Sequence, residues 1–183
     1  SGRQCLCGEC AAKLVPAEEF RSGLKACAAY SYEGAARDVM LCFKFGENPE
    51  LCADTLADWL CGAFDAHYDG ESFDFAVSVP SFGKHPRMEL FIRDFAKRRR
   101  LCYRPELLIK TRPTEKQHHL SAAERRINLR GAFAASEAVR GKSILLTDDI
   151  FTTGSTVQEC CAALLAAGAE SVSVLTVLKA EGR

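Results

Sequence analysis

The chain has 183 residues, of which 48% are hydrophobic and 26% are charged, as in an ordinary soluble globular domain with one core. Lys plus Arg and Asp plus Glu each number 24, so bulk charge predicts neither nucleic-acid nor membrane binding, and leaves open only a local patch. No apolar run reaches the roughly 18 residues of a membrane span, and no basic-then-apolar signal segment opens the chain. We therefore expect a cytoplasmic protein with no membrane partner.

The ten cysteines fall into two groups. Most stand in patterned helices, which favours small buried side chains in a reducing compartment. They are Cys42, Cys52, Cys61, Cys102, Cys160 and Cys161. At the start of the chain, Cys7 and Cys10 have the spacing of a zinc knuckle, but a closed site needs four ligands. Only Cys5 and the distant Cys27 could complete it. A structural Zn²⁺ on Cys5, Cys7 and Cys10 is one hypothesis, and reduced surface cysteines or an incomplete finger are the other.

The first part of the chain is predicted to be mainly helical. Residues 30–34 predict a short strand and a turn. Residues 35–45 carry apolar side chains at helical spacing, and the Gly-Glu-Asn-Pro run after them ends that helix. A second helix over 50–64 is expected to place Leu51, Leu56, Leu60 and Phe64 on one side. Trp59 is expected in the core or at an interface rather than as a base-stacking platform.

A buried strand over 73–80 and a helix over 86–100 follow. Asp74 is expected in the turn before the strand, and Leu90, Phe91, Ile92 and Phe95 are expected to face inward from the helix. The helix ends in Lys97-Arg98-Arg99-Arg100. This cationic turn either complements the helix dipole or forms a nucleic-acid patch. The dipole interpretation is favoured, because no aromatic residues interleave for stacking on bases.

A short strand over 106–110 leads into a long polar stretch over 111–133. Ser121 and Glu124 fit a capping box, so part of this stretch is expected to be structural. A long polar loop would suit a lid that excludes water from a reactive sugar. His118 and His119 lie within it, either as acid/base groups or as solvated loop residues.

Residues 142–156 are the most informative stretch. Residues 143–147 predict a strand buried on both faces, ending in Asp148 and Asp149. The run Thr-Thr-Gly-Ser-Thr then opens a helix that extends to about Gly168, and a helix N-terminus rich in hydroxyls suits a phosphate. Two carboxylates would repel that phosphate, so their natural partners are sugar hydroxyls or Mg²⁺. Together these features predict a ribose 5-phosphate site.

Other interpretations of this stretch remain. An Asp pair could simply end a strand before an ordinary capped helix, or form an acidic pocket that binds Mg²⁺ and accepts a phosphoryl group. A Walker A loop and a dinucleotide fingerprint are both absent. The helix is expected to bury Val157, Cys161, Leu164 and Leu165, and residues 172–178 predict a final parallel strand. The alternation of strands and helices predicts an α/β, doubly wound, mostly parallel sheet with its ligand at the carboxyl edge.

The stretch Lys142–Thr156 resembles the signature of the type I phosphoribosyltransferases, which binds phosphoribosyl diphosphate (PRPP). The resemblance implies that Asp148 and Asp149 act as the catalytic pair and hold the ribose hydroxyls. It also implies a 5-phosphate loop and a diphosphate loop, to which Arg87 would add positive potential. The 5-phosphate loop comprises Thr152, Thr153, Gly154, Ser155 and Thr156, and the diphosphate loop comprises Ser81, Phe82, Gly83 and Lys84.

A second pattern over residues 114–133, T-x-x-Q…L-S-x-x-E-R-x-x-N-L-x-G-A-F, resembles the ComF-like members of this class, which are associated with competence and DNA uptake. It implies a flexible loop that uses Arg112, Thr114, Gln117 and Arg125. The resemblance also implies a phosphoribosyltransferase domain over 30–183, preceded by a short Cys-containing segment over 1–29.

The resemblance implies phosphoribosyl transfer from PRPP to a nitrogenous acceptor, with Mg²⁺ as cofactor and release of diphosphate. The alternative is a non-catalytic module on the same fold that senses PRPP or nucleotides, or that serves DNA uptake with competence proteins as partners. Assembly into a homodimer is left open.

Overall fold

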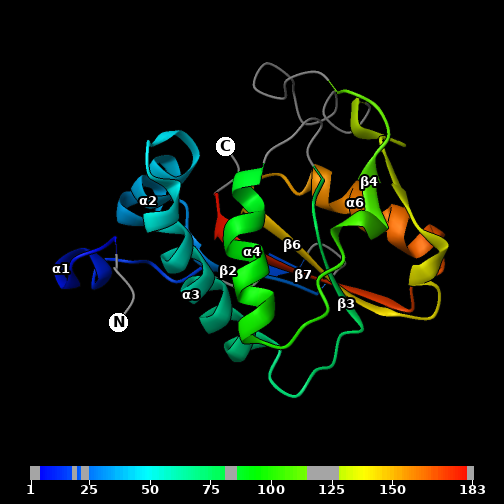
Figure 1. Ribbon diagram of the computed structural model, residues 1–183, viewed down its shortest axis with the longest axis horizontal. Helices are drawn as coiled ribbons and strands as arrows, with labels where there is room; N and C mark the ends of the chain where they lie inside the picture. Colours follow the sequence, from blue (N-terminus) through cyan, green and yellow to red (C-terminus); the bar gives the residue numbers. More distant parts are fainter. Residues whose placement is uncertain (1–4, 18–19, 22–24, 81–85, 115–127, 181–183) are drawn as a thin grey trace.

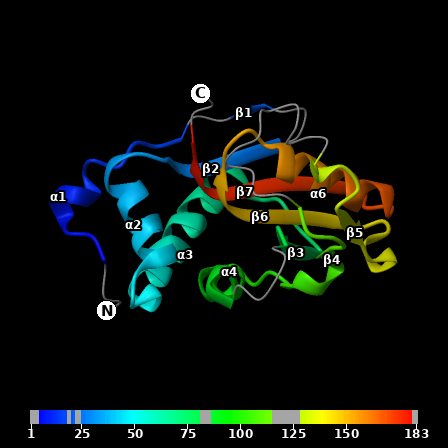
Figure 2. The ribbon, with the colours of Figure 1, turned by 90° about the horizontal axis from the view of Figure 1, so that it is seen from above.

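The computed structural model describes residues 5–17, 20–21, 25–80, 86–114 and 128–180. Its centre is a five-stranded sheet in the order β1-β2-β7-β6-β3 (Figures 1 and 2). The strands, in chain order, are β1 (Phe20–Arg21), β2 (Lys25–Ser31), β3 (Phe75–Ser78), β6 (Ser143–Phe151) and β7 (Ser171–Lys179). β2, β7, β6 and β3 run parallel to one another, and the short edge strand β1 is antiparallel to β2. The predicted mostly parallel α/β sheet is confirmed.

Both faces of the sheet are buried, because alternate strand residues enter two separate cores. Leu145 joins one core, and its neighbours Ile144 and Leu146 join the other. The first core lies under α2 (Gly34–Phe45), α3 (Pro49–His67) and α4 (Pro86–Arg98). The second lies under α6 (Ser155–Ala166) and a small antiparallel sheet of β4 (Leu108–Lys110) and β5 (Phe133–Ala135). Figure 1 shows the first group of helices on one side of the molecule and α6 with β4 on the other.

Three short helical segments complete the described structure: α1 (Gly8–Ala11), η1 (Pro105–Leu107) and η3 (Glu137–Val139). α1 lies at the margin of the molecule in both Figure 1 and Figure 2. Beyond β3, the chain around Tyr103 extends the sheet through a parallel bridge to Ala76. The Ala76 N–H donates to the Cys102 carbonyl at 3.0 Å, and the Arg104 N–H donates to the Ala76 carbonyl at 2.9 Å. No described helix is long and apolar enough to cross a membrane.

The strand that contains Tyr30 begins earlier than its sequence pattern suggested. β2 begins at Lys25 and pairs with β7 from Lys25 to Ser31, so residues 25–29 are part of the central sheet although the predicted N-terminal segment extended to residue 29. The two helices that follow are confirmed. Trp59 lies in the core, where its ring meets Tyr30 edge-on at 5.1 Å between centroids.

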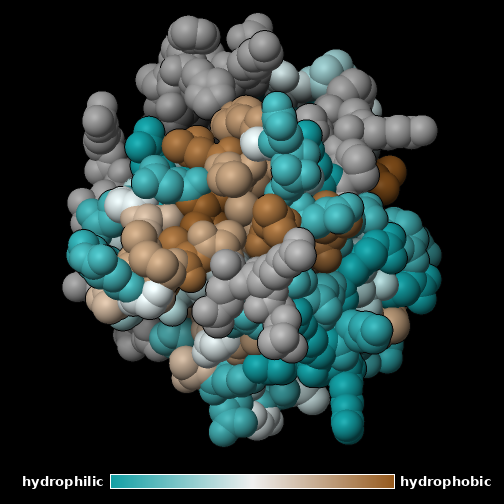
Figure 3. All heavy atoms as spheres, turned by 60° about the vertical axis from the view of Figure 1, so that its left-hand side comes forward, coloured by the Kyte–Doolittle hydropathy of each residue, from teal (hydrophilic) through white to brown (hydrophobic). Residues whose placement is uncertain are grey.

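Several predicted core positions are wrong. Leu51, Leu90 and Leu165 are exposed, and so are Cys42 and Cys102. On α6 the buried stripe is Val157, Cys160, Cys161 and Leu164, which follows the i, i+3, i+4, i+7 pattern of one helix face. Leu165 lies at the edge of this stripe, about 40° beyond Cys161, and its side chain is 44% exposed. Figure 3, with the α1 and α2 side turned forward, shows apolar side chains gathered on the surface among hydrophilic ones.

β6 is longer than its apolar run. The strand was expected to end at Thr147, but it continues to Phe151 because β7 pairs with it throughout. Asp148 lies opposite Thr176, and Ile150 lies opposite Leu178. On the other side, β3 ends at Ser78 opposite Thr147, so the last residues of β6 extend past it. Asp148 and Asp149 therefore lie on the part of β6 that projects beyond β3.

Candidate functional site

Asp148 and Asp149 lie at the carboxyl end of β6, the edge at which open α/β sheets bind ligands. Both are half-buried, and both carboxylates are held by the backbone of the strand. Asp148 Oδ1 accepts a hydrogen bond from the Asp149 N–H at 2.9 Å, and Asp149 Oδ1 accepts one from the Ile150 N–H at 2.7 Å. The other oxygen of each carboxylate is not held by these two backbone bonds.

The two carboxyls differ in charge environment. Lys44, at the end of α2, forms an ion pair with Asp149 Oδ2. Burial, followed by the charge of Asp149, raises the pKa of Asp148 well above its usual range, and Lys44 partly opposes this effect. Lys44 therefore compensates Asp149 directly, whereas Asp148 is the carboxyl that its surroundings favour in the protonated form. Local sequence could not predict the pairing of Lys44 with Asp149, because Lys44 belongs to a helix far earlier in the chain.

A sharp turn joins β6 to α6. Gly154 caps the helix with φ +75°, a left-handed conformation that favours glycine. A Cβ atom at this position would lie 2.5 Å from Cζ of the Phe151 ring, so the close approach of the ring also requires glycine. The Gln158 N–H donates to the Gly154 carbonyl at 2.8 Å at the start of the helix. The turn thus places the N-terminus of α6 directly after the acid pair.

The predicted phosphate loop supplies hydroxyl and amide donors at this helix end. Thr153 Oγ1 and Ser155 Oγ are hydrogen-bonded at 3.0 Å. Ser155 is buried, while Thr152 and Thr153 are exposed and reach solvent. The backbone N–H groups of a first helical turn lack intrahelical partners, and the helix dipole favours an anion there. The structure therefore brings the loop and the acid pair together on one strand–turn–helix unit.

The predicted diphosphate loop, Ser81, Phe82, Gly83 and Lys84, lies outside the described residues. The strand before it ends beside β6, because the Val79 N–H donates to the Thr147 carbonyl at 2.9 Å. Arg87 was expected to add positive potential to this loop, but it caps α2 instead. Its Nη1 donates to the Lys44 carbonyl at 2.7 Å and lies 3.4 Å from the carbonyl oxygens of Phe43 and Gly46.

Two predicted flexible-loop residues lie at the described start of the stretch, and one of them, Arg112, links it to the described residues after the gap. Arg112 Nη2 donates to the carbonyls of Asn128 at 2.9 Å and Arg130 at 3.0 Å. Thr114 Oγ1 accepts a hydrogen bond from Lys110 Nζ at 2.7 Å. Burial lowers the pKa of Lys110. Gln117 and Arg125, like His118 and His119, lie outside the described residues.

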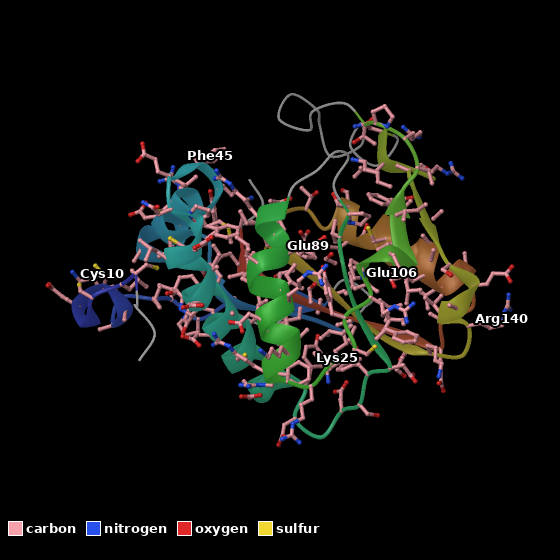
Figure 4. The ribbon with its side chains drawn as sticks, viewed as in Figure 1. Cys10, Lys25, Phe45, Glu89, Glu106 and Arg140 are labelled. Atoms are coloured by element: carbon pink, nitrogen blue, oxygen red, sulfur yellow. The ribbon has the colours of Figure 1, made fainter. Side chains whose placement is uncertain are left out.

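The N-terminal cysteines do not gather into a group of three or more in the described structure. Cys5 Sγ lies 3.2 Å from Thr55 Oγ1 of α3, and Cys27 is buried in β2. Cys7 caps the N-terminus of α1 and Cys10 lies within it, and the Cys10 backbone N–H and thiol lower the pKa of Cys7. Figure 4 shows Cys10 at the margin of the molecule. Among the described residues, no group of three or more His, Cys, Asp or Glu side chains could hold a metal ion. The Zn²⁺ site stays a prediction.

Comparison with known proteins identifies the fold. Residues 109–183 match the family model of the phosphoribosyl transferase domain. Among solved structures, the chain is similar to the glutamine phosphoribosylpyrophosphate amidotransferase from B. subtilis, solved with ADP and GMP. The TM-score is 0.50 with 20% sequence identity, over 74% of this chain and 30% of that chain. The chain therefore has the type I phosphoribosyltransferase fold, and the match over 109–183 contains β6, the turn and α6.

The chain is also similar to curated relatives over a shorter stretch. Over 69 residues the chain is 46% identical to the DNA utilization protein YhgH of Escherichia coli O157:H7 and 44% identical to that of Salmonella typhi. The matched part is 38% of this chain and spans 30% of the relatives' length. The predicted resemblance to phosphoribosyltransferases is confirmed at the level of domain and fold.

Proposed function

We propose that this chain binds PRPP at the carboxyl end of β6 and transfers its phosphoribosyl group to a nitrogenous acceptor. The observation that supports this most strongly is the continuous unit of acid pair, Gly154 turn and α6 N-terminus. The acid pair offers hydrogen-bond acceptors, and the loop a few residues later offers donors. Ribose 5-phosphate is complementary to this order, because it carries hydroxyl donors on the ring and a phosphate acceptor at one end.

In this proposal the chain's own residues act mainly by positioning. The ribose hydroxyls donate to Asp148 and Asp149, and the 5-phosphate accepts from the first turn of α6 and from Thr153. The bond between the anomeric carbon and the diphosphate oxygen breaks, a bond from that carbon to the acceptor nitrogen forms, and the nitrogen loses a proton. Fixing the sugar at both ends aligns the anomeric carbon for this exchange.

The residues present fit Mg²⁺ only as part of a shell that the ligand completes. Carboxylate oxygens are suitable ligands for Mg²⁺, but Asp149 already pairs with Lys44, and no cluster of three ligand side chains exists in the described ranges. Mg²⁺ commonly takes one or two carboxylates together with substrate phosphates and water. We therefore propose that Mg²⁺ accompanies the diphosphate of PRPP, whose departure it would assist by charge neutralisation.

The proposal is tested by calorimetry with Mg²⁺ alone, with ribose 5-phosphate, and with PRPP plus Mg²⁺. We expect both sugar phosphates to bind, and we expect Thr153→Val to weaken them alike by about threefold to tenfold, because both carry the same 5-phosphate. Diphosphate release from PRPP across a panel of nitrogenous bases then identifies the acceptor. Tight Mg²⁺ binding without sugar, combined with no PRPP binding at millimolar concentration, would overturn the assignment in favour of an acidic phosphoryl-acceptor pocket.

The name of these relatives, DNA utilization protein, favours a second candidate function. On this alternative the chain binds PRPP or a nucleotide without turnover and acts in DNA uptake through other proteins, since fold and function are separable. The two candidates differ in one measurement: binding of PRPP with no diphosphate release against any base supports the sensor, whereas release with one base supports the transferase.

A further inference from the structure

Lys44 approaches the acid pair from a different part of the fold. It lies near the end of α2, under which the first core is packed, whereas the proposed ligand site is built by β6 and α6. Its Nζ pairs with Asp149 Oδ2, while the Ile150 N–H holds Asp149 Oδ1 at 2.7 Å. Both oxygens of Asp149 thus have a partner from the protein, and the plane of the carboxylate is fixed from two sides.

The backbone around Lys44 is itself anchored. Phe43 is buried, and its ring meets Phe91 of α4 edge-on at 5.3 Å between centroids. Arg87 donates to the Lys44 carbonyl at 2.7 Å, and the Gly46 N–H donates to the Cys42 carbonyl at 2.7 Å. Phe45, labelled in Figure 4 at the end of α2, is instead 79% exposed. The chain therefore holds Lys44 between a core anchor and a helix cap, and only its side chain extends to Asp149.

The charge of Lys44 gives its ion pair with Asp149 a role in ligand binding. Without Lys44, the carboxylate of Asp149 would have no counter-ion, would repel an anionic sugar phosphate, and would be held only by the Ile150 N–H. The ammonium group of Lys44 reduces the repulsion and selects one orientation. The pair is sheltered, since the side chain of Lys44 is 32% exposed and that of Asp149 is 17% exposed. Such a pair is less screened by salt than an exposed one.

We propose that Lys44 is the positioning residue of the acid pair: it holds Asp149 in the orientation that receives the ribose hydroxyls, and it acts through Asp149 rather than by touching the diphosphate. This inference rests on the proposed function, which it deepens by adding a residue from α2 to the ribose-binding machinery. It requires that the effect of Lys44 on binding be the same for ribose 5-phosphate and for PRPP, and that it vanish once Asp149 is changed.

Calorimetry on the full chain tests this, using ribose 5-phosphate alone and PRPP with Mg²⁺ as probes. Lys44→Met keeps the apolar stem and removes the charge, and we expect it to weaken both ligands about threefold to tenfold. Lys44→Arg should restore most of the affinity, because it restores the cation. In the Asp149→Asn background, Lys44→Met should have no further effect. Lys142→Met is the matched control, since it removes an ion pair with Asp74 at the opposite end of β6 and should leave both affinities unchanged.

The outcomes separate the two proposals. Suppose first that the wild type binds both probes. The positioning role is then overturned, and the proposed function stands, if Lys44→Met binds them as well as the wild type or more tightly. The same holds if Lys44→Met loses affinity for PRPP alone, or if its loss of affinity adds to that of Asp149→Asn. If the wild type binds neither probe at millimolar concentration, the proposed function fails and the positioning role falls with it. Equal losses for both probes, rescued by Arg and absent in the Asn background, support the role of Lys44.

Discussion

At Asp148, folding and ligand binding favour different protonation states. Burial raises its pKa in the native state, so between the unfolded and the native pKa the native state holds more protons. Stability therefore falls as the pH rises through this window. Asp148→Asn removes the ionisation, and we expect the variant to be more stable than the wild type at pH 7, with a gain that shrinks toward about pH 4. Urea unfolding at both pH values measures this, and lower stability of the variant at pH 7 would contradict it.

The same substitution should weaken the ligand. Asn keeps an acceptor oxygen but loses the charge-assisted bond to a ribose hydroxyl, which corresponds to about 1.5–3 kcal/mol, or roughly tenfold to a hundredfold in PRPP affinity. The matched control is Asp74→Asn, at the other end of the sheet. Asp74 accepts from the Ser143 N–H at 2.9 Å and from Lys142 Nζ at 3.0 Å, and these bonds lower its pKa. That change should reduce stability and leave affinity intact, as calorimetry can establish.

At the scale of elements, the turn between β6 and α6 depends on one glycine. Gly154→Ala places a side chain in a left-handed conformation and against the Phe151 ring, so we expect a loss of about 1–3 kcal/mol in unfolding free energy. Binding of ribose 5-phosphate should weaken as well, because the first turn of α6 shifts. Gly62→Ala in the middle of α3 is the control: nothing lies within 4 Å of its added Cβ, and it should stabilise by about 0.5–1 kcal/mol. Chemical denaturation of both variants checks the opposite signs.

The cationic end of α4 serves the packing of helices. Arg98 pairs with Asp94 on its own helix and with Asp54 and Asp58 of α3, and Arg99 pairs with Asp65 of α3. These contacts agree with the predicted structural role, and they occupy the guanidinium groups that a DNA phosphate would need. We expect Arg98→Gln to lower stability by no more than about 1 kcal/mol and to leave any affinity for a fluorescent DNA duplex unchanged at low salt. A severalfold loss of DNA binding in the variant would show that this turn contacts DNA.

At the scale of the whole molecule, Tyr68 joins α3 to the sheet. Its ring is buried, and its hydroxyl donates to the Val174 carbonyl of β7 at 2.7 Å. Tyr68→Phe removes this donor and leaves a buried carbonyl short of a partner, which should reduce the unfolding free energy by about 1–2 kcal/mol. Urea denaturation measures the change. Val174 lies on β7 opposite Leu146, two residues before Asp148, but Tyr68 is not part of the proposed binding site. Affinity for PRPP should therefore not change, and a loss of affinity would argue for coupling between the two regions.

Local pattern predicted the fold because strand and helix periods alternate regularly along the chain. It also located the acid pair and the glycine turn, which are contiguous in sequence. The sequence pattern failed where a strand boundary or a side-chain contact depends on residues far away in the sequence. Pairing with β7 extends β6 beyond its apolar run, and the ion pair with Asp149 comes from Lys44. The contacts of Arg87 with the carbonyls at the end of α2 were missed for the same reason. The diphosphate residues and the centre of the flexible loop stay predictions.

The hydrogen bonds from the strand backbone to the two carboxylates have an entropic consequence. A side chain that is mobile before binding loses rotamer freedom when it is immobilised, at a cost of roughly 0.5–1.5 kcal/mol for rotamer-rich groups. Asp148 and Asp149 lose that freedom when the chain folds, because neighbouring N–H groups hold both of them. Folding therefore fixes the directions of these acceptors before a ligand binds at the end of β6. The conformational entropy lost on binding is then mainly that of the sugar phosphate.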